Sequence, residues 1–220
     1  MHGLPWRTAA RRRARALACA CAGAWACALG AACGGARAAD STRSAAELMD
    51  VVMWNRETIG GPFALIDGTR HLRRDSEFRG RVMLVYFGFT TCASICPTDL
   101  LEIGKALDRL GAAASQAAAL FITLDPERDT AELLKAYVPS FHPQLIGLTG
   151  PPADIERVAA DFKVYHAKVP VKGAMGYTID HSSYIYIVGR DGRYAGFLPP
   201  GSNAERIVAT LKPLLTAAPR

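Results

Sequence analysis

The segment Thr90-Thr91-Cys92-Ala93-Ser94-Ile95-Cys96-Pro97 sets two cysteines between a buried strand and a helix, and it constrains the fold more than any other part of the chain. The preceding run Val82–Phe89 is apolar and rich in β-branched and aromatic residues, which is typical of a strand covered on both faces. Pro97 suits the first helical position, because the first N–H groups of a helix lack intrahelical partners anyway. The pattern predicts a strand, a loop that carries Cys92, and a helix N-terminus at Cys96.

The predicted helix runs from Pro97 to Leu110. It is expected to end at Gly111, since glycine is common just past helix C-termini. Asp99 and Glu102 are expected in its first turn, where the helix dipole favours acidic side chains.

The rest of the folded part predicts strands and helices in alternation. The expected elements are, in order, a hairpin over 63–72 with an Asp67-Gly68 turn, a strand at 117–124, a helix capped by Thr130 and running to about Tyr137, a strand at 145–148, a helix at 151–162, a hairpin of 182–188 with 193–198, and a helix at 204–215. Lys163–Thr178 shows no clear period and is expected to be a surface insertion, either a loop or an added hairpin. This order predicts an α/β domain with parallel strands and an antiparallel edge. With a cysteine pair at the first crossover, the thioredoxin-like fold is the best match: a central mixed sheet flanked by helices, with an N-terminal hairpin and an insertion before the C-terminal hairpin.

The first 38 residues have the composition of an export segment. Arginines between Arg7 and Arg15 precede an uncharged, alanine-rich run over 16–32, which matches a basic n-region followed by an h-region. Ala36-Arg37-Ala38 fits a cleavage site, Cys33 is a candidate lipid-attachment site, and the run nearly reaches the length of a membrane span. We expect a signal peptide or a membrane or lipid anchor over 1–38, a tether over 39–59, and a folded domain over 60–220 on the periplasmic side of a bacterial inner membrane, anchored or free.

The positive charge of the chain comes from that first segment. Residues 1–38 contain six arginines and no acidic residue, so the rest of the chain has 20 Lys and Arg against 20 Asp and Glu. A domain that binds nucleic acid normally carries a basic face. The charge distribution therefore argues against a nucleic-acid partner.

Cys92 and Cys96 are the only cysteines of the predicted domain. A thiol at a helix N-terminus has a lowered pKa, which makes it available as a nucleophile or as a metal ligand. The three intervening residues are compatible with a disulfide and also with two sulfurs around an ion. An inert bridge over so short a loop would remove little entropy from the unfolded chain. Thioredoxin-type reductases have two intervening residues, so the spacing argues mildly against a plain disulfide exchanger.

A metal site would need a third ligand, for which the domain offers His71, His142, His166 and His181. His181 directly precedes the strand predicted at 182–188, whose entry loop lies beside the N-terminus of the first helix in a thioredoxin-like sheet. Two thiolates and one imidazole form a soft three-coordinate site that suits Cu(I) and accepts Cu(II) with one more ligand. Structural zinc would require a fourth ligand, and none is obvious.

Four segments together resemble the Sco/SenC family of copper chaperones, which have a thioredoxin-like fold and act in cytochrome oxidase assembly. The segments are Phe87-Gly88-Phe89-Thr90-Thr91-Cys92-Ala93-Ser94-Ile95-Cys96-Pro97, Thr123-Leu124-Asp125-Pro126-Glu127-Arg128-Asp129-Thr130, Gly147-Leu148-Thr149-Gly150 and Asp180-His181-Ser182-Ser183. The resemblance implies that Cys92, Cys96 and His181 bind copper. It also implies that Asp180 and Asp129 act beside the ligands or in recognition of a partner.

The function that this resemblance implies is that of a metallochaperone rather than an enzyme. Copper, as Cu(I) or Cu(II), would come from an upstream donor and pass by thiolate exchange to the binuclear copper site of cytochrome c oxidase subunit II. The alternative is a periplasmic thiol-disulfide reductase that reduces the cysteines of that site, in which Cys92 attacks and Cys96 resolves.

Overall fold

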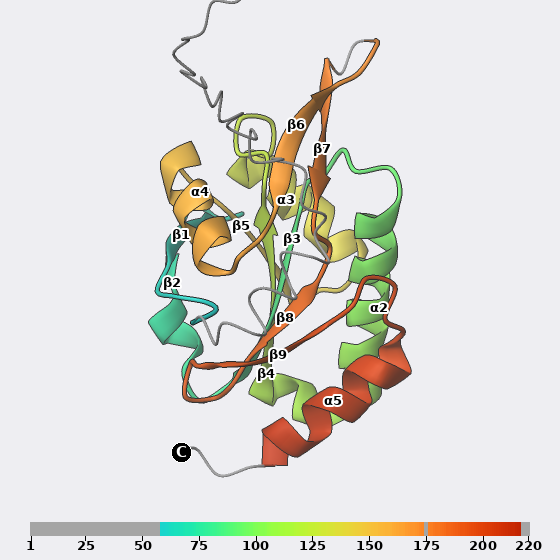
Figure 1. The fold of residues 1–220 in the computed structure, drawn as a ribbon. Helices are drawn as coiled ribbons and strands as arrows, with labels where there is room; N and C mark the ends of the chain where they lie inside the picture. Colours follow the sequence, from blue (N-terminus) through green and yellow to red (C-terminus); the bar gives the residue numbers. More distant parts are fainter. Residues whose placement is uncertain (1–57, 174–175, 217–220) are drawn as a thin grey trace, which may run out of the picture. The chain divides into compact units, whose positions relative to one another are not determined.

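The computed structural model describes residues 58–173 and 176–216. They form a seven-stranded sheet in the order β2-β1-β5-β4-β3-β8-β9, with helices on both faces, and a separate two-stranded ribbon of β6 and β7 (Figure 1). Strands β3, β4 and β5 are parallel to one another, and the other pairings are antiparallel. The predicted mixed sheet flanked by helices is confirmed. The predicted export segment 1–38, its Cys33, and residues 39–57 of the tether lie outside the described residues.

The strands and helices follow one another along the chain in the predicted order. The strands of the large sheet are β1 (Ala64–Asp67), β2 (Leu72–Arg74), β3 (Val82–Gly88), β4 (Ala117–Thr123), β5 (Leu145–Thr149), β8 (Ile185–Val188) and β9 (Tyr194–Leu198). The ribbon consists of β6 (His166–Pro170) and β7 (Tyr177–His181). The helices are α2 (Ile95–Leu110), α3 (Ala131–Tyr137), α4 (Pro152–Asp161) and α5 (Ala204–Thr216), with short 3₁₀ turns η1 (Asp75–Phe78), η2 (Gly111–Gln116) and η3 (Val138–Ser140).

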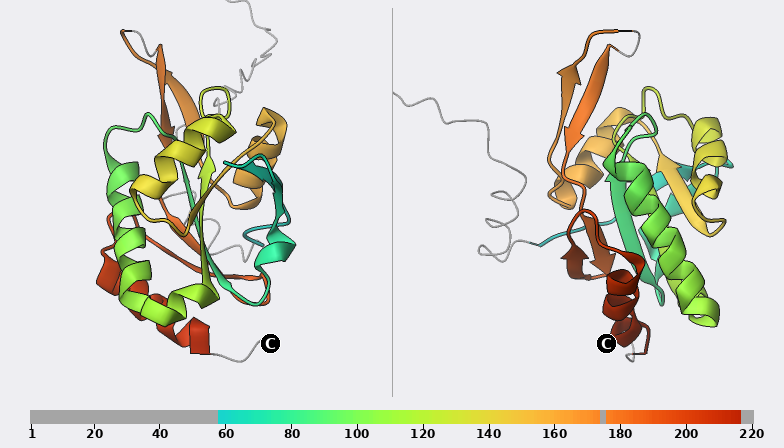
Figure 2. Two further views of the ribbon diagram at one scale, coloured as in Figure 1. Left: turned by 180° about the vertical axis from the view of Figure 1, so that it is seen from behind. Right: turned by 90° about the vertical axis from the view of Figure 1, so that its right-hand side faces the viewer.

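Strand β3 lies in the interior of the sheet, and every one of its residues is buried. Leu84 and Tyr86 pack into the core beneath α2, α3 and α5, whereas Val85 and Phe87 pack into the core beneath α4. The helices accordingly cover opposite faces of the sheet (Figure 2). Alternate side chains of β3 point to opposite faces of the sheet, and both faces are covered. Every position of the strand is therefore buried, which explains the continuous apolar run.

Helix α2 begins at Ile95, two residues earlier than predicted, so Cys96 lies within the first turn and Pro97 is the third helical residue. Proline is tolerated there, since the first four N–H groups have no intrahelical acceptor. The expectation that Asp99 and Glu102 lie in the first turn is wrong. Asp99 accepts a hydrogen bond from the Gly201 N–H, just before α5, and Glu102 accepts one from the Ala204 N–H at its start. These contacts explain the two acids by packing of the segment around the α5 N-terminus rather than by the dipole of α2.

The insertion predicted at Lys163–Thr178 is an added hairpin, the ribbon β6–β7, which projects beyond the large sheet (Figures 1 and 2). Its second strand continues to His181, and β8 begins only at Ile185. The prediction that His181 lies in a loop before a strand starting at Ser182 is therefore wrong, because the residue ends a strand of the ribbon.

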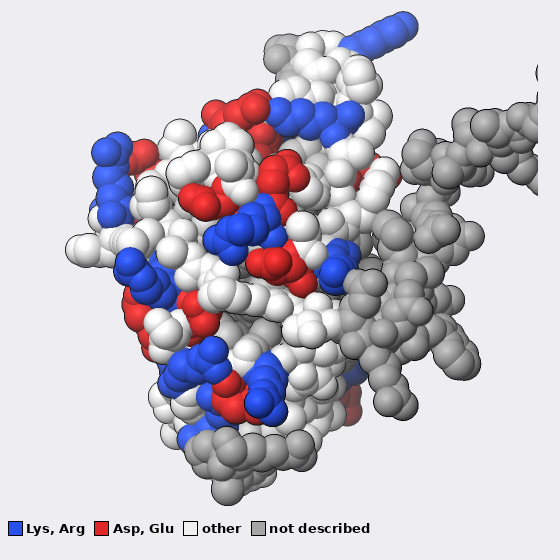
Figure 3. Space-filling model, turned by 60° about the vertical axis from the view of Figure 1, so that its left-hand side comes forward, with Lys and Arg blue, Asp and Glu red and all other residues white. Residues whose placement is uncertain are grey.

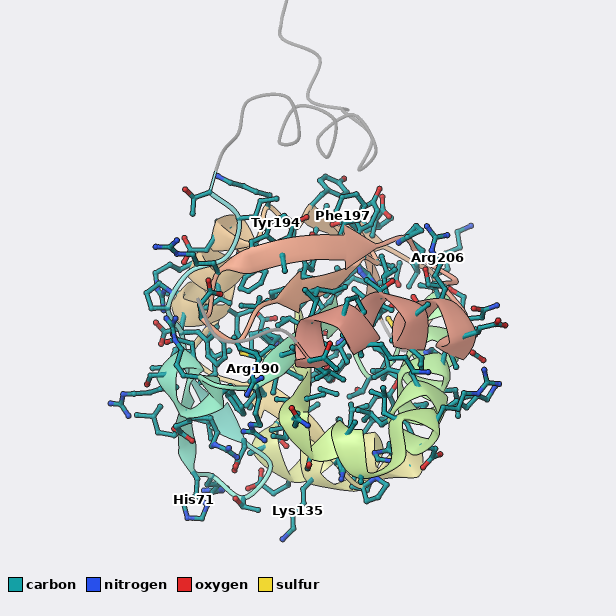
Figure 4. All side chains as sticks on the ribbon, turned by 90° about the horizontal axis from the view of Figure 1, so that it is seen from below. His71, Lys135, Arg190, Tyr194, Phe197 and Arg206 are labelled. Carbon is teal, nitrogen blue, oxygen red and sulfur yellow. The ribbon has the colours of Figure 1, made fainter. Side chains whose placement is uncertain are left out.

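Acidic and basic side chains are interspersed on the face drawn in Figure 3. Arg73, for example, forms ion pairs with both Asp67 and Glu77. On the edge strand β9, Tyr194 and Phe197 lie on the sheet face away from α5 (Figure 4). None of the helices in the described part of the chain is both long and apolar enough to cross a bilayer.

Candidate metal centre

The cysteine loop, residues 89–94, connects the end of β3 at Gly88 to the start of α2 at Ile95. The backbone N–H of Cys92 donates to the Phe89 carbonyl over 3.2 Å, which turns the chain back toward α2. Cys96 is fully buried, Cys92 is half-buried, and both are free thiols. A Cβ atom at Gly88 would lie 2.9 Å from Cys96 Sγ, so the sulfur packs directly against the glycine backbone and leaves no room for a side chain there.

His181 reaches the cysteines from the end of β7. Its Nε2 lies 3.4 Å from Cys96 Sγ, and its Nδ1 lies 3.2 Å from the Ser182 carbonyl oxygen. The Phe89 ring and the imidazole pack edge to face, with the ring centroids 5.7 Å apart. Because a carbonyl only accepts, it favours a proton on Nδ1 and leaves Nε2 to face the sulfurs, which is how metal-binding histidines are commonly oriented.

Cys92, Cys96 and His181 bring their potential ligand atoms within 4.8 Å of one another. In the described part of the chain, no other three or more Cys, His, Asp or Glu side chains cluster in this way. Two sulfurs and one imidazole nitrogen form a soft donor set that fits copper. Tetrahedral structural zinc fits less well, since the described residues add no fourth ligand of these types.

The two thiols differ strongly in acidity. The pKa of Cys92 is lowered to about 3, chiefly because the Cys96 thiol donates a hydrogen bond to its sulfur. His181 and the backbone N–H groups of Ser94 and Cys96 add to this effect and outweigh burial. The pKa of Cys96 is raised by its hydrogen bond to Cys92 and by burial. At neutral pH the pair therefore carries one negative charge, on Cys92, and one proton, on Cys96.

Two buried polar groups near Cys96 escaped the sequence prediction. The Tyr86 hydroxyl and Asp99 Oδ2 are buried without a hydrogen-bond partner, whereas Asp99 Oδ1 accepts from the Gly201 N–H over 2.9 Å. Burial raises the pKa of Asp99 and also that of Tyr86. The three-residue spacing from Cys96 to Asp99 was the available signal, since residues i and i+3 share a helix face. Tyr86 lies within a continuous apolar strand, and no sequence pattern distinguishes it from its neighbours.

The two aspartates suggested by resemblance differ in their surroundings. Asp129 is fully buried and accepts hydrogen bonds from the Thr90 N–H over 2.9 Å, the Thr90 hydroxyl over 2.5 Å and the Thr123 hydroxyl over 2.6 Å. Burial raises its pKa despite these bonds. Asp129 therefore supports the cysteine loop. Asp180 is exposed beside His181 in β7 and lies opposite Ala167 of β6.

The other three candidate histidines contact different partners. His71 Nδ1 lies 2.8 Å from the Thr69 hydroxyl, His142 Nε2 lies 3.3 Å from Asp108 Oδ1, and His166 Nε2 lies 3.1 Å from Glu156 Oε1. His166 pairs with His181 across the ribbon, yet it is not part of the ligand cluster.

Comparisons with known proteins agree on one family. A family model described as SCO1/SenC matches residues 52–216. The SCO2-like protein of Rickettsia prowazekii (strain Madrid E) is 41% identical over 155 residues, which cover 70% of this chain and 76% of that protein. The mitochondrial SCO1 homologue of Homo sapiens is 34% identical over 155 residues, covering 70% of this chain and 52% of that protein.

Solved structures show the same likeness. Bradyrhizobium japonicum ScoI with copper bound matches with a TM-score of 0.67 and 42% identity, over 71% of this chain and 99% of that one. Yeast Sco1 with copper bound matches with a TM-score of 0.66 and 30% identity, over 74% of this chain and 92% of that one.

Proposed function

The chain belongs to the SCO1/SenC family, and from that premise we propose that it binds copper through Cys92, Cys96 and His181 and acts in cytochrome c oxidase assembly. The convergence of one ligand atom from each of the three side chains within 4.8 Å of one another carries this proposal, because it supplies a soft donor set. The copper-bound ScoI and Sco1 structures support the choice of metal.

The acidity of the two thiols suggests how copper binds. Cys92 is half-buried and already a thiolate, so it is the accessible sulfur for an incoming ion. Cys96 must lose its proton when it binds the same ion, and His181 Nε2 completes the site. Because the proton and copper compete for Cys96, copper affinity falls as pH falls.

We further propose that copper leaves by ligand exchange. An incoming thiolate displaces Cys92 or Cys96 through a three-coordinate intermediate, so that bare copper never forms; Cys92 is the more accessible. His181, the only nitrogen ligand, is released first. The recipient would be the binuclear copper site of cytochrome c oxidase subunit II, the supplier an upstream copper donor, and the location the periplasmic side of the membrane, reached through residues 1–38.

Copper titration of the reduced protein tests the proposal. We expect one Cu(I) per chain, loss of binding in Cys92→Ser, and weaker binding in His181→Ala. His166→Ala is the matched control, because His166 lies across the ribbon from His181 but contacts Glu156. A His181→Ala protein with parental affinity would exclude the three-ligand site.

A reductase is the second candidate, supported by the contrast between an accessible thiolate and a buried thiol. The Cys92 thiolate would attack a substrate disulfide and release one substrate thiolate. Cys96, after losing its proton, would attack the Cys92 sulfur, release the second substrate thiol and leave a Cys92–Cys96 disulfide, which an external dithiol would reduce.

Turnover of a disulfide substrate separates the two candidates. The reductase predicts multiple turnovers with an external dithiol, and Cys96→Ser would accumulate a mixed disulfide on Cys92. Stoichiometric copper binding with negligible turnover would favour the chaperone.

A further inference from the structure

The ribbon β6–β7 carries His181 but pairs with no strand of the large sheet. An isolated two-stranded hairpin is only marginally stable in water. At its base, the Ser182 N–H donates to the Tyr165 carbonyl over 2.9 Å and the Tyr165 N–H donates to Ser182 Oγ over 3.1 Å. The contacts that hold the rest of the ribbon therefore affect the position of the His181 imidazole.

Tyr177, at the opposite end of β7 from His181, is held by the loop Asp125–Asp129. Its hydroxyl donates to Asp125 Oδ1 over 2.8 Å, and its carbonyl accepts from Arg128 Nη1 over 3.1 Å. The Arg128 guanidinium lies 3.8 Å from the centre of the Tyr177 ring and also pairs with Asp125, whose side chain is only 1% exposed. A cation stacked on the ring and a charge-assisted hydrogen bond fix this side chain in two directions.

The same loop holds the cysteines. Asp129, its last residue, accepts hydrogen bonds from the backbone and side chain of Thr90, two residues before Cys92. The loop is closed on itself, because the N–H groups of Asp129 and Arg128 both donate to the Asp125 carbonyl, over 2.8 and 3.0 Å. One rigid turn thus contacts the cysteine loop on one side and the ribbon on the other.

We propose that Tyr177, clamped by Asp125 and Arg128, is a positioning residue that holds His181 at binding distance from the two sulfurs. It acts through β7, since four residues of strand separate the two side chains by about 13 Å. A second contact, Lys168 with Glu127, has both side chains about half exposed, and such pairs contribute little. The inference rests on the proposed function only in that copper is held by all three ligands.

Copper affinity of Tyr177 variants tests the clamp. By analogy with residues that orient metal ligands, we expect Tyr177→Ala to weaken Cu(I) binding about tenfold in a chelator competition, and Tyr177→Phe to weaken it less because the ring stays on Arg128. In the Cu(II) form, the nitrogen hyperfine signal in the electron paramagnetic resonance spectrum should weaken in Tyr177→Ala. Tyr194→Phe is the control for Tyr177→Phe, because Tyr194 lies on β9 opposite Val188, at the end of β8 that is farther along the chain from His181, and it should match the parent in both measurements.

A double-mutant cycle distinguishes positioning from general destabilisation. If Tyr177 acts through His181, Tyr177→Ala will reduce affinity in the parent and have no further effect in a His181→Ala background. Equal losses in both backgrounds, or parental affinity in Tyr177→Ala and Tyr177→Phe, would overturn the inference. Failure of the proposed function looks different: His181→Ala itself would then bind copper like the parent.

Discussion

The cysteines and the histidine of the candidate metal centre are supported in different ways. Cys96 lies in the first turn of a 16-residue helix, and its sulfur packs on a strand that is buried along its whole length. His181 ends one strand of a ribbon that stands apart from the large sheet, and its side chain is only half-buried. Cys96 is thus part of the core, whereas His181 lies on a ribbon that is attached to the core.

This contrast suits the proposed function, in which the protein binds copper and also releases it. Moving Cys96 would disturb the packing of the core, so its sulfur has a fixed position. Moving His181 would disturb its contacts with Phe89 and Cys96 and those of the ribbon, but no strand pairing of the large sheet. Elements with few buried contacts open at low free-energy cost. On the proposed function, the core would fix where the ion sits, and the ribbon would allow His181 to move toward the ion and away from it.

The largest predicted effect is a loss of stability when a methyl group is added beside Cys96 in the core. In Gly88→Ala, the new methyl group would lie 2.9 Å from Cys96 Sγ and 3.0 Å from Phe121 Cε2. We expect the free energy of unfolding to fall by about 2–3 kcal/mol, because overpacked cores relax poorly, and Cu(I) affinity to fall with it. Urea denaturation and chelator competition measure the two quantities.

Gly150→Ala is the matched control for that substitution. Its added Cβ would meet only the end of the Leu65 side chain, at 3.2 Å, so the cost should be smaller and copper affinity unchanged. An unaltered stability in Gly88→Ala would show that Cys96 is not held by the core.

The same contrast decides what the sequence could predict. The run Val82–Phe89, the helix ending at Gly111 and the Thr130 cap are local patterns, and all three elements are found, with Thr130 Oγ1 accepting from the Leu133 N–H. Cys92 and Cys96 come together because only three residues separate them in the sequence. These features follow from the spacing of neighbouring residues.

The position of His181 depends on contacts that no local pattern reveals. The residue lies 85 positions from Cys96, and it was expected in a loop before the next strand rather than at the end of β7. Tyr177 and Arg128 are 49 residues apart, so nothing in the periodicity of either segment points to their contact. Family resemblance predicted His181 as a ligand, but the clamp on its strand could only be found in three dimensions.

An intermediate effect is expected when a hydrogen bond at the base of the ribbon β6–β7 is removed. In Ser182→Ala, the Tyr165 N–H loses its acceptor, at a cost of about 1 kcal/mol. We expect faster hydrogen exchange in the amides of β6 and β7, little change in α2, and a modest loss of copper affinity.

Ser202→Ala is the control for Ser182→Ala, since Ser202 is also buried and its hydroxyl donates to the Pro199 carbonyl, away from the ribbon. It should leave exchange in β6 and β7 unchanged. Equal acceleration throughout the protein in Ser182→Ala would mean that the ribbon and the core unfold as one unit, and that Cys96 and His181 are not supported separately.

The smallest effect is predicted for the other hairpin, β1–β2, which is part of the large sheet and far in sequence from the ligands. Burial alone would raise the pKa of Asp67, but hydrogen bonds from Thr69, His71 and Arg73 outweigh it and hold the pKa below its usual value. A carboxyl group with a lowered pKa in the folded state stabilises the protein above its unfolded pKa of about 3.9, and this stabilisation is lost as pH falls through the folded pKa. Asp67→Asn should therefore lower the free energy of unfolding by about 0.5–1 kcal/mol at neutral pH, and the difference from the parent should shrink below about pH 4. Copper affinity at neutral pH should stay unchanged, because this hairpin supports the sheet and not the ligands. If Asp67→Asn weakened copper binding as much as Ser182→Ala, the site would depend on the stability of the whole fold rather than on how the ribbon is attached.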